Sequence, residues 1–217
     1  MEGKIQIMAL IIFDFDGVLA DTLNDLIQFG QEACDELDIS HVVKKDDLCN
    51  LEMMSFAAFG RACEVPENFI DEFVQRCLKR FAEKKSPPAI FNGLRDIVRK
   101  LATNNTIAII TTNSSQNVHA FLIEHGLDGN IQAVYGIDTP GSKAQKISIA
   151  RKQFSTDTKR EPVFMVGDSL SDINAAKEAA VTSVAVTWGH QSLEHLLRGN
   201  PDHVVHFPQE LIEVINK

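Results

Sequence analysis

The stretch Leu10–Thr22, with the sequence LIIFDFDGVLADT, carries the strongest signal in the chain. Four apolar residues lead into Asp14 and Asp16, and Gly17 follows at once. Because residues two apart on an extended chain point to the same side, both carboxylates are predicted to project from the end of a buried strand. Two neighbouring carboxylates repel each other unless a proton or a cation is shared between them. The pattern therefore indicates metal-assisted chemistry at a strand end.

Length and composition fit one globular core, alone or with a smaller appended lobe. The chain has 217 residues, of which 44% are hydrophobic and 24% charged, as is usual for soluble proteins. A net charge of −9 gives no electrostatic signal for nucleic acid or an anionic membrane. The longest apolar run is too short to span a bilayer. Asp14 and Asp16 interrupt the apolar run near the N-terminus, whereas the apolar segment of a signal peptide is uninterrupted. We therefore expect a cytoplasmic protein without nucleic-acid or membrane partners.

The cysteines and histidines show no spacing typical of a metal or redox motif. We expect the cysteines to be reduced and to act as small apolar side chains, and the histidines to have surface or structural roles. The cysteines are Cys34, Cys49, Cys63 and Cys77, and the histidines are His41, His119, His125, His190, His195, His203 and His206.

Short apolar runs that alternate with helical patterns predict parallel strands buried on both faces, as in an α/β sheet. The stronger strand candidates are Ala9–Phe13, Thr106–Ile110, Val163–Val166 and Ser183–Val186, and the weaker ones are Ala133–Tyr135 and His203–Val205. Apolar stripes at helical spacing predict helices between them, over Gly93–Ala102, Ser115–His125, Lys143–Phe154 and Asp172–Ala180, the last starting at Ser171 or Asp172.

The pattern changes between the first strand and the remaining sheet. From about Leu23 strand-like runs disappear and helix-like ones dominate, until Pro87-Pro88 ends the segment, since paired prolines stop a helix. We predict an all-helical insertion over residues 23–86, and an α/β core formed by residues 1–22 and 87–217.

Polar residues follow three of the strand candidates directly. Asp14 follows the first, Thr111-Thr112-Asn113 the second, and Gly167-Asp168-Ser169 the third. Ligands of open α/β sheets bind outside the carboxyl ends of the strands. The three ends, far apart in sequence, are therefore expected to converge on one site.

The segments DFDGVLADT, ITTNS and VGDSLSDINAAK together resemble the motifs of the haloacid dehalogenase-like hydrolase superfamily. The resemblance covers roughly Ala9–Thr22 and Asn92–Leu211. It implies a Rossmann-like three-layer core with a mainly parallel sheet, and the insertion is similar in position and length to the small helical cap of the family. The branch it resembles contains phosphoglycolate phosphatase-like and β-phosphoglucomutase-like enzymes.

The resemblance also implies catalytic roles. Asp14 matches the nucleophile, which forms an aspartyl phosphate, and Asp16 matches the general acid and base. Members that cleave carbon–halogen bonds lack the second carboxylate, so Asp16 favours phosphoryl transfer. Lys143, in TPGSKAQKI, is the expected lysine that offsets the charge of nucleophile and phosphate. Lys146 is the alternative, because the Lys-Pro pair of many relatives is absent here.

The metal and phosphate ligands follow in the same way. The resemblance implies Mg²⁺ bound by the Asp14 carboxylate, the Asp16 backbone carbonyl and Asp168, in keeping with the preference of this ion for oxygen ligands. Asp172 is expected to bind the ion through water or to orient its neighbours; as a plain helix cap it would do neither.

Phosphate binding is expected from Thr112 and Lys143. Thr112 matches the hydroxyl that donates a hydrogen bond to the phosphoryl group, with Thr111 as the neighbouring alternative. Asn113 is a further candidate for contact with the substrate phosphate, and Arg61 in the insertion is a candidate for a second anionic group on the substrate.

The function expected from these residues is that of a Mg²⁺-dependent phosphatase. It would hydrolyse a small phosphorylated metabolite through an aspartyl phosphate, as phosphoglycolate phosphatase-like enzymes do, and act as a monomer or homodimer. A sugar phosphomutase of the β-phosphoglucomutase type is the enzymatic alternative. A non-catalytic, phosphorylation-controlled regulatory domain is the alternative of another class.

Overall fold

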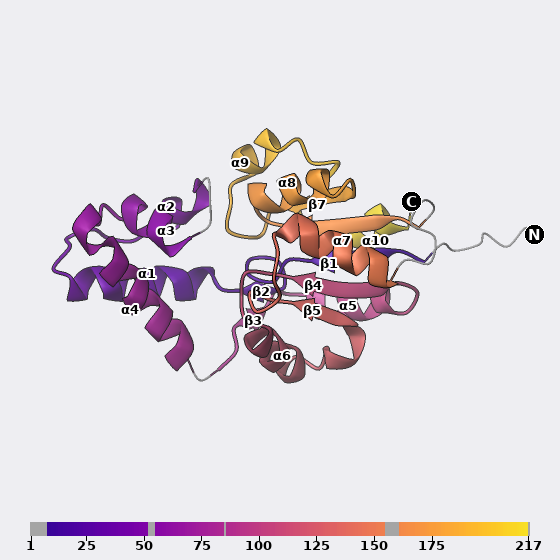
Figure 1. The fold of residues 1–217 in the computed structure, drawn as a ribbon, viewed down its shortest axis with the longest axis horizontal. Helices are drawn as coiled ribbons and strands as arrows, with labels where there is room; N and C mark the ends of the chain where they lie inside the picture. The colour runs from indigo at the N-terminus through magenta and orange to yellow at the C-terminus, as the bar shows by residue number, and fades with distance from the viewer. Residues whose placement is uncertain (1–7, 52–54, 85, 155–160, 217) are drawn as a thin grey trace, which may run out of the picture.

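A parallel sheet forms the centre of the core (Figure 1). It has six strands in the order β5-β4-β1-β6-β7-β8. The protein is described by a computed structural model over residues 8–51, 55–84, 86–154 and 161–216. The first strand is central, since Phe13 pairs with Ile109 on one side and Val166 on the other. The strands are β1 (Leu10–Phe13), β4 (Thr106–Ile110), β5 (Ala133–Tyr135), β6 (Val163–Gly167), β7 (Thr182–Val186) and β8 (His203–Val205).

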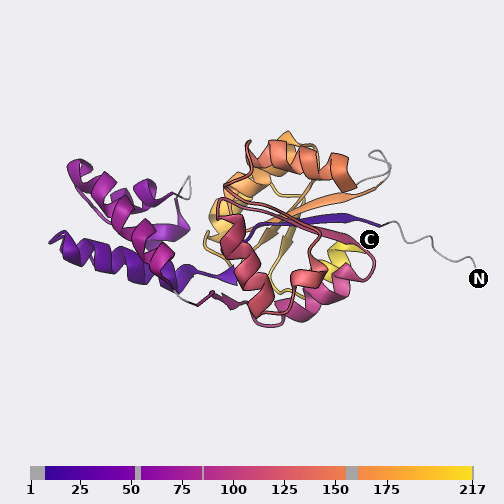
Figure 2. The ribbon, with the colours of Figure 1, turned by 60° about the horizontal axis from the view of Figure 1, so that its bottom comes forward.

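Helices cover both faces of this sheet, which gives three layers (Figure 2). Ile11 and Phe13 pack into one hydrophobic cluster with α5, α6 and α10, whereas Leu10 and Ile12 pack into a second with α7 and α8. This alternation explains why β1 has a continuous apolar sequence. The helices of the core are α5 (Leu94–Ala102), α6 (Ser115–Glu124), the 3-10 turn η2 (Asp128–Asn130), α7 (Lys143–Phe154), α8 (Leu170–Glu178), α9 (Leu193–Arg198) and α10 (Glu210–Ile215).

These layers confirm the predicted Rossmann-like α/β fold class. Several predicted bounds differ from the structure by one or two residues; among them, α8 begins at Leu170, not at Ser171 or Asp172, and ends at Glu178, not at Ala180. The cause of the earlier start is a capping box, in which the Ser169 side chain accepts from the Asp172 backbone N–H and the Asp172 side chain accepts from the Ser169 backbone N–H. Asp172 therefore lies in the first helical turn.

The described residues of the insertion, 23–51, 55–84 and 86, lie to one side of the sheet (Figure 1). Their helices share a hydrophobic cluster of their own, in which Phe59 and Phe73 meet edge to face. Gly30 on α1 allows close packing here, since a Cβ would lie 2.5 Å from the Phe59 ring. The elements are α1 (Leu23–Glu36), α2 (Asp46–Cys49), α3 (Phe56–Ala62), η1 (Glu67–Phe69) and α4 (Ile70–Glu83).

The two connections between the core and this helical insertion pair with each other. Strand β2 (Ala20–Asp21) runs antiparallel to β3 (Ala89–Ile90). The sequence did not predict this pair, because two-residue strands carry no periodicity. The pairing brings both ends of the insertion to one place beside the sheet.

None of the helices in the described residues has the length and apolar character that crossing a membrane requires.

Candidate active site

Four charged residues meet at the carboxyl edge of the central strands. Asp14 follows β1, Asp168 follows β6, Asp172 lies in the first turn of α8, and Lys143 opens α7. One carboxylate oxygen from each of the three acids lies within 4.8 Å of the others. The structure thus brings together residues that are up to 158 positions apart in sequence (172 − 14).

Lys143 is the cation of this cluster. Its Nζ lies 2.9 Å from Asp14 Oδ2 and 2.5 Å from Asp172 Oδ1. Burial alone would lower the pKa of the Lys143 ammonium, but the two carboxylates outweigh it and the pKa is raised. Lys146, the alternative lysine, instead donates to the backbone carbonyl of Gly136 at 2.6 Å. Of the two, it is Lys143 that contacts the nucleophile candidate.

Asp14 has the surroundings expected of a metal ligand. Its Oδ1 is buried and has no hydrogen-bond partner. Burial, with the neighbouring Asp172 and Asp168, raises the pKa of Asp14 well above its usual value despite Lys143. Burial and the charge of Asp172 also raise the pKa of Asp168, to about 7. An unpartnered buried oxygen among carboxylates suits a hard divalent cation such as Mg²⁺, so these residues fit the ion.

Asp172 has two roles that the sequence left as alternatives. Its Oδ2 accepts from the Ser169 backbone N–H at 3.1 Å and from Ser169 Oγ at 2.5 Å, which caps α8. Its Oδ1 accepts from Lys143. The same carboxylate therefore fixes the start of the helix and positions the lysine.

Asp16 lies beside the acidic cluster, facing a small cavity. Asn113 Nδ2 donates to both carboxylate oxygens of Asp16, at 3.3 and 3.1 Å. Burial raises the pKa of Asp16, although the Asn113 hydrogen bonds oppose the shift. A cavity of about 110 Å³ borders Asp16 and Asn113 and reaches the end of the insertion at Lys84, which forms an ion pair with Asp25. Asp16, the candidate general acid, thus borders a cavity whose lining combines apolar side chains with Asp16, Asn113 and Lys84.

The end of β4 offers two hydroxyls. Thr111 is buried, and its Oγ1 accepts from the Asn113 backbone N–H at 3.0 Å. Thr112 is exposed. Arg61, the candidate cation of the insertion, forms an exposed salt bridge with Glu67 at 2.6 Å on the insertion itself.

His190 is a site residue that the sequence analysis missed. Its backbone N–H donates to Asp168 Oδ2 at 2.7 Å, and its Nε2 lies 3.2 Å from Thr22 Oγ1, at the start of the insertion. Gly189 permits this approach, since a Cβ there would lie 2.3 Å from Asp168 Cβ. The sequence offered one indication of this residue: residues 187–190 directly follow the predicted strand Ser183–Val186, as the other three site segments follow theirs.

The next two residues join the insertion to the same loop. Gln191 Nε2 donates to the Leu51 carbonyl at 2.6 Å, and the Ser192 backbone N–H donates to the Cys49 carbonyl at 3.0 Å. Gln191 Oε1 also accepts from the Leu170 backbone N–H at 2.7 Å, at the start of α8. The segment 190–192 thus contacts the insertion and the acidic cluster together.

The chain belongs to the haloacid dehalogenase-like hydrolase family. A sequence model of that family matches residues 11–186, which confirms the resemblance seen in the three motifs and the expectation of an enzyme.

Individual relatives and a solved structure are similar to the chain over nearly its whole length. The chain is 26% identical over 221 aligned positions to a phosphoglycolate phosphatase from Synechococcus elongatus, covering 97% of this chain and 98% of the relative. It is 24% identical to the pyrophosphatase PpaX of Listeria monocytogenes, covering 99% and 98%. In fold it is similar to a haloacid dehalogenase-like hydrolase from Streptococcus pneumoniae, with a TM-score of 0.82, 22% identity, and coverage of 95% and 98%.

Proposed function

We propose that the protein is a Mg²⁺-dependent phosphatase that hydrolyses a small phosphorylated metabolite through an aspartyl phosphate on Asp14. The observation that carries the proposal is the contact of Lys143 Nζ with Asp14 Oδ2 at 2.9 Å, with Asp16 two residues further on beside the cavity. This arrangement supports the proposal, because it pairs the proposed nucleophile with a fixed cation and leaves the proposed proton donor, Asp16, beside an open cavity.

In the proposed reaction, an Asp14 carboxylate oxygen attacks phosphorus while the bond to the leaving oxygen breaks. Asp16 gives its proton to that oxygen, and then takes a proton from the water that attacks the aspartyl phosphate. The bond between Asp14 and phosphorus breaks in this second step and inorganic phosphate leaves. Lys143 offsets the charge of nucleophile and phosphate throughout. Asp172 keeps Lys143 in place through its 2.5 Å contact.

Mg²⁺ would be held by the Asp14 and Asp168 carboxylates and the Asp16 backbone carbonyl, and when bound it supplies positive charge against the phosphoryl oxygens. The unpartnered Oδ1 of Asp14 supports this assignment. Thr112, exposed at the end of β4, and Asn113 are the proposed contacts to the phosphoryl oxygens, with Thr111 as the alternative hydroxyl. The helical insertion is proposed to act as a cap that excludes water during turnover.

The cavity supports a small leaving group. It measures about 110 Å³, and Asn117 and the Lys84–Asp25 pair line it together with Asp16. Relatives with nearly the same length are named phosphoglycolate phosphatase and pyrophosphatase, and we propose a substrate of comparable size, of the phosphoglycolate type. The four buried free cysteines are consistent with a cytoplasmic, reducing location.

A substrate screen with Mg²⁺ tests this function. Phosphoglycolate, pyrophosphate and sugar phosphates are supplied one at a time, and both inorganic phosphate and the organic product are measured. We expect phosphate release from a small ester and none in excess chelator. Conversion of a sugar phosphate to its isomer without net phosphate release would identify a mutase instead. No turnover of any ester would indicate a regulatory domain.

Metal affinity is expected to depend on pH. Without the ion the pKa of Asp168 is about 7, and metal ligands must lose their protons before binding. Because the folded-state pKa is raised, protons stabilise the ion-free fold below this pH, and that contribution is lost as the pH rises through about 7. The Kd for Mg²⁺ should fall by up to about tenfold per pH unit between pH 5 and 7.

Calorimetric titration with Mg²⁺ at pH 5, 6, 7 and 8 measures this dependence. Thermal unfolding should show a larger Mg²⁺-induced rise in Tm at pH 8 than at pH 5. A Kd that does not change with pH would contradict the binding of Mg²⁺ by Asp168.

A further inference from the structure

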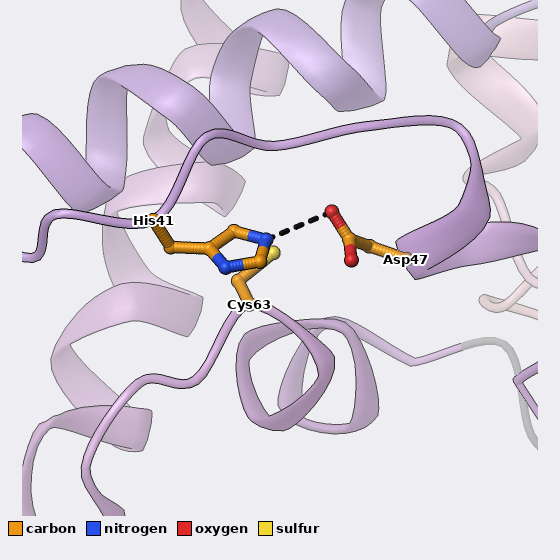
Figure 3. Close-up of side chains that lie close together, drawn as sticks. All are labelled: His41, Asp47 and Cys63. Atoms are coloured by element: carbon orange, nitrogen blue, oxygen red, sulfur yellow. Dashed lines mark hydrogen bonds and ion pairs between the residues drawn. The ribbon is translucent and has the colours of Figure 1, made fainter.

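A second group of metal-ligating side chains lies inside the helical insertion, apart from the active-site acids. His41 follows α1, Asp47 lies in α2, and Cys63 ends α3. The ligand atoms of these three residues lie within 4.8 Å of one another. Figure 3 shows the Asp47 carboxylate facing the imidazole, with the Cys63 sulfur beside the same ring; His41 Nε2 lies 2.9 Å from Asp47 Oδ2.

We propose that His41, Asp47 and Cys63 form a zinc site, with a water molecule as the fourth ligand. The ion would tie the loop between α1 and α2 to the end of α3. This site is distinct from the proposed Mg²⁺ site, which consists of oxygen ligands only.

The ligand chemistry selects the metal. Imidazole nitrogen, thiolate sulfur and carboxylate oxygen are the ligands of zinc, whereas Mg²⁺ and Ca²⁺ prefer oxygen alone. One carboxylate and one thiolate also balance the charge of a divalent cation, so binding leaves no net charge in a largely buried place.

Contacts outside the cluster hold the backbone at His41 and Cys63 and the carboxylate of Asp47. Gln31 on α1 fixes the backbone around His41, because its Nε2 donates to the His41 carbonyl at 3.2 Å and its Oε1 accepts from the Val43 backbone N–H at 2.8 Å. The Lys44 backbone N–H donates to Asp47 Oδ2 at 2.7 Å. Cys63 caps α3, its N–H donating to the Phe59 carbonyl at 2.9 Å. The cluster is therefore preorganised, as metal sites require.

The cluster is open on one side and closed on the other. The side chains of His41 and Asp47 are 17% and 16% exposed, whereas Cys63 is fully buried. A cation can therefore reach the imidazole and the carboxylate from solvent. Burial raises the pKa of the Cys63 thiol, so zinc binding should displace its proton.

The simplest competing explanation of the cluster is that the His41–Asp47 hydrogen bond only holds the loop between α1 and α2 in place.

Cobalt substitution in the full-length protein separates the two explanations. The protein is first stripped of metal and then saturated with Mg²⁺. Co²⁺ is added, thiolate-to-cobalt charge-transfer absorption is recorded, and zinc is then added as competitor. We expect one equivalent of Co²⁺ per chain with a thiolate band, which zinc abolishes. Cobalt at the active-site acids would give no such band, since no cysteine lies among those ligands.

Variants locate the site. Cys63→Ser should remove the band, and His41→Gln and Asp47→Asn, at partly exposed positions, should weaken zinc binding at least about 100-fold while the protein remains folded. Cys49→Ser is the matched control, a buried cysteine of the same insertion outside the cluster, and should bind zinc normally. Absence of a thiolate band in the wild type, or its persistence in Cys63→Ser, would overturn the proposal.

Discussion

Replacing Asp14 with Asn is expected to lower the turnover of an aryl phosphate by about 10⁴-fold or more, the scale on which loss of a covalent nucleophile acts. An amide of nearly the same size fills the position, but it does not attack phosphorus at a useful rate. Initial rates of aryl phosphate hydrolysis with saturating Mg²⁺ measure the effect.

The same substitution should leave the fold intact. Asp14 is a buried carboxylate whose pKa is raised by burial and neighbouring acids, so a neutral side chain removes repulsion. The Tm of the variant without Mg²⁺ should equal or exceed that of the wild type at pH 8. Asp96→Asn, at an exposed carboxylate on α5, is the control and should retain full activity. An active Asp14→Asn enzyme would disprove the assignment of the nucleophile.

Replacing Lys143 with Met should lower turnover by about 10³-fold, toward the upper end of the effect of removing one fixed donor from a transition state. The Lys143 ammonium contacts both Asp14 and Asp172, so its loss leaves nucleophile and phosphate to repel each other. Breaking this buried pair should also cost about 3–5 kcal/mol of stability at neutral pH without Mg²⁺. Rates and denaturant unfolding curves measure the two effects.

Lys146→Met is the matched control, on the same helix and also buried. Lys146 donates to the Gly136 carbonyl, so its loss should reduce stability by about 1–3 kcal/mol for the unpaired carbonyl and change turnover only a few-fold. If Lys146→Met lost activity and Lys143→Met kept it, the assignment of the active-site lysine would be reversed.

The sequence predicted the sheet well because each strand is a short apolar run buried on both faces. All six strand candidates correspond to strands of the structure, and Lys143–Phe154 has the same bounds as α7. The start of α8 was missed because Ser169 and Asp172 cap each other, a reciprocal contact that apolar periodicity does not report. The β2–β3 pair was missed because two-residue strands carry no periodicity and because the pair forms only where both ends of the insertion meet.

The candidate site was predictable where residues follow strands and carry charge. His190 was not predicted, because its hydrogen bond to Asp168, at 2.7 Å, is made by the backbone N–H, which any residue at this position could supply; its ring Nδ1 lies 3.4 Å from the same carboxylate oxygen. The His41, Asp47 and Cys63 cluster was missed for another reason. These residues are brought together by the packing of α1, α2 and α3, and their spacing in sequence matches no metal motif.

The central claim is that Asp14 carries the phosphoryl group during turnover. The direct measurement uses Asp16→Asn with Mg²⁺ and an aryl phosphate, whose leaving phenolate needs no proton, so that the aspartyl phosphate forms but lacks the base for its hydrolysis. After acid quenching and proteolysis, mass spectrometry should find one phosphoryl group on the peptide that contains Asp14. Phosphate release with no phosphorylated Asp14 at any time, or a phosphoryl group on a different residue, would contradict the account.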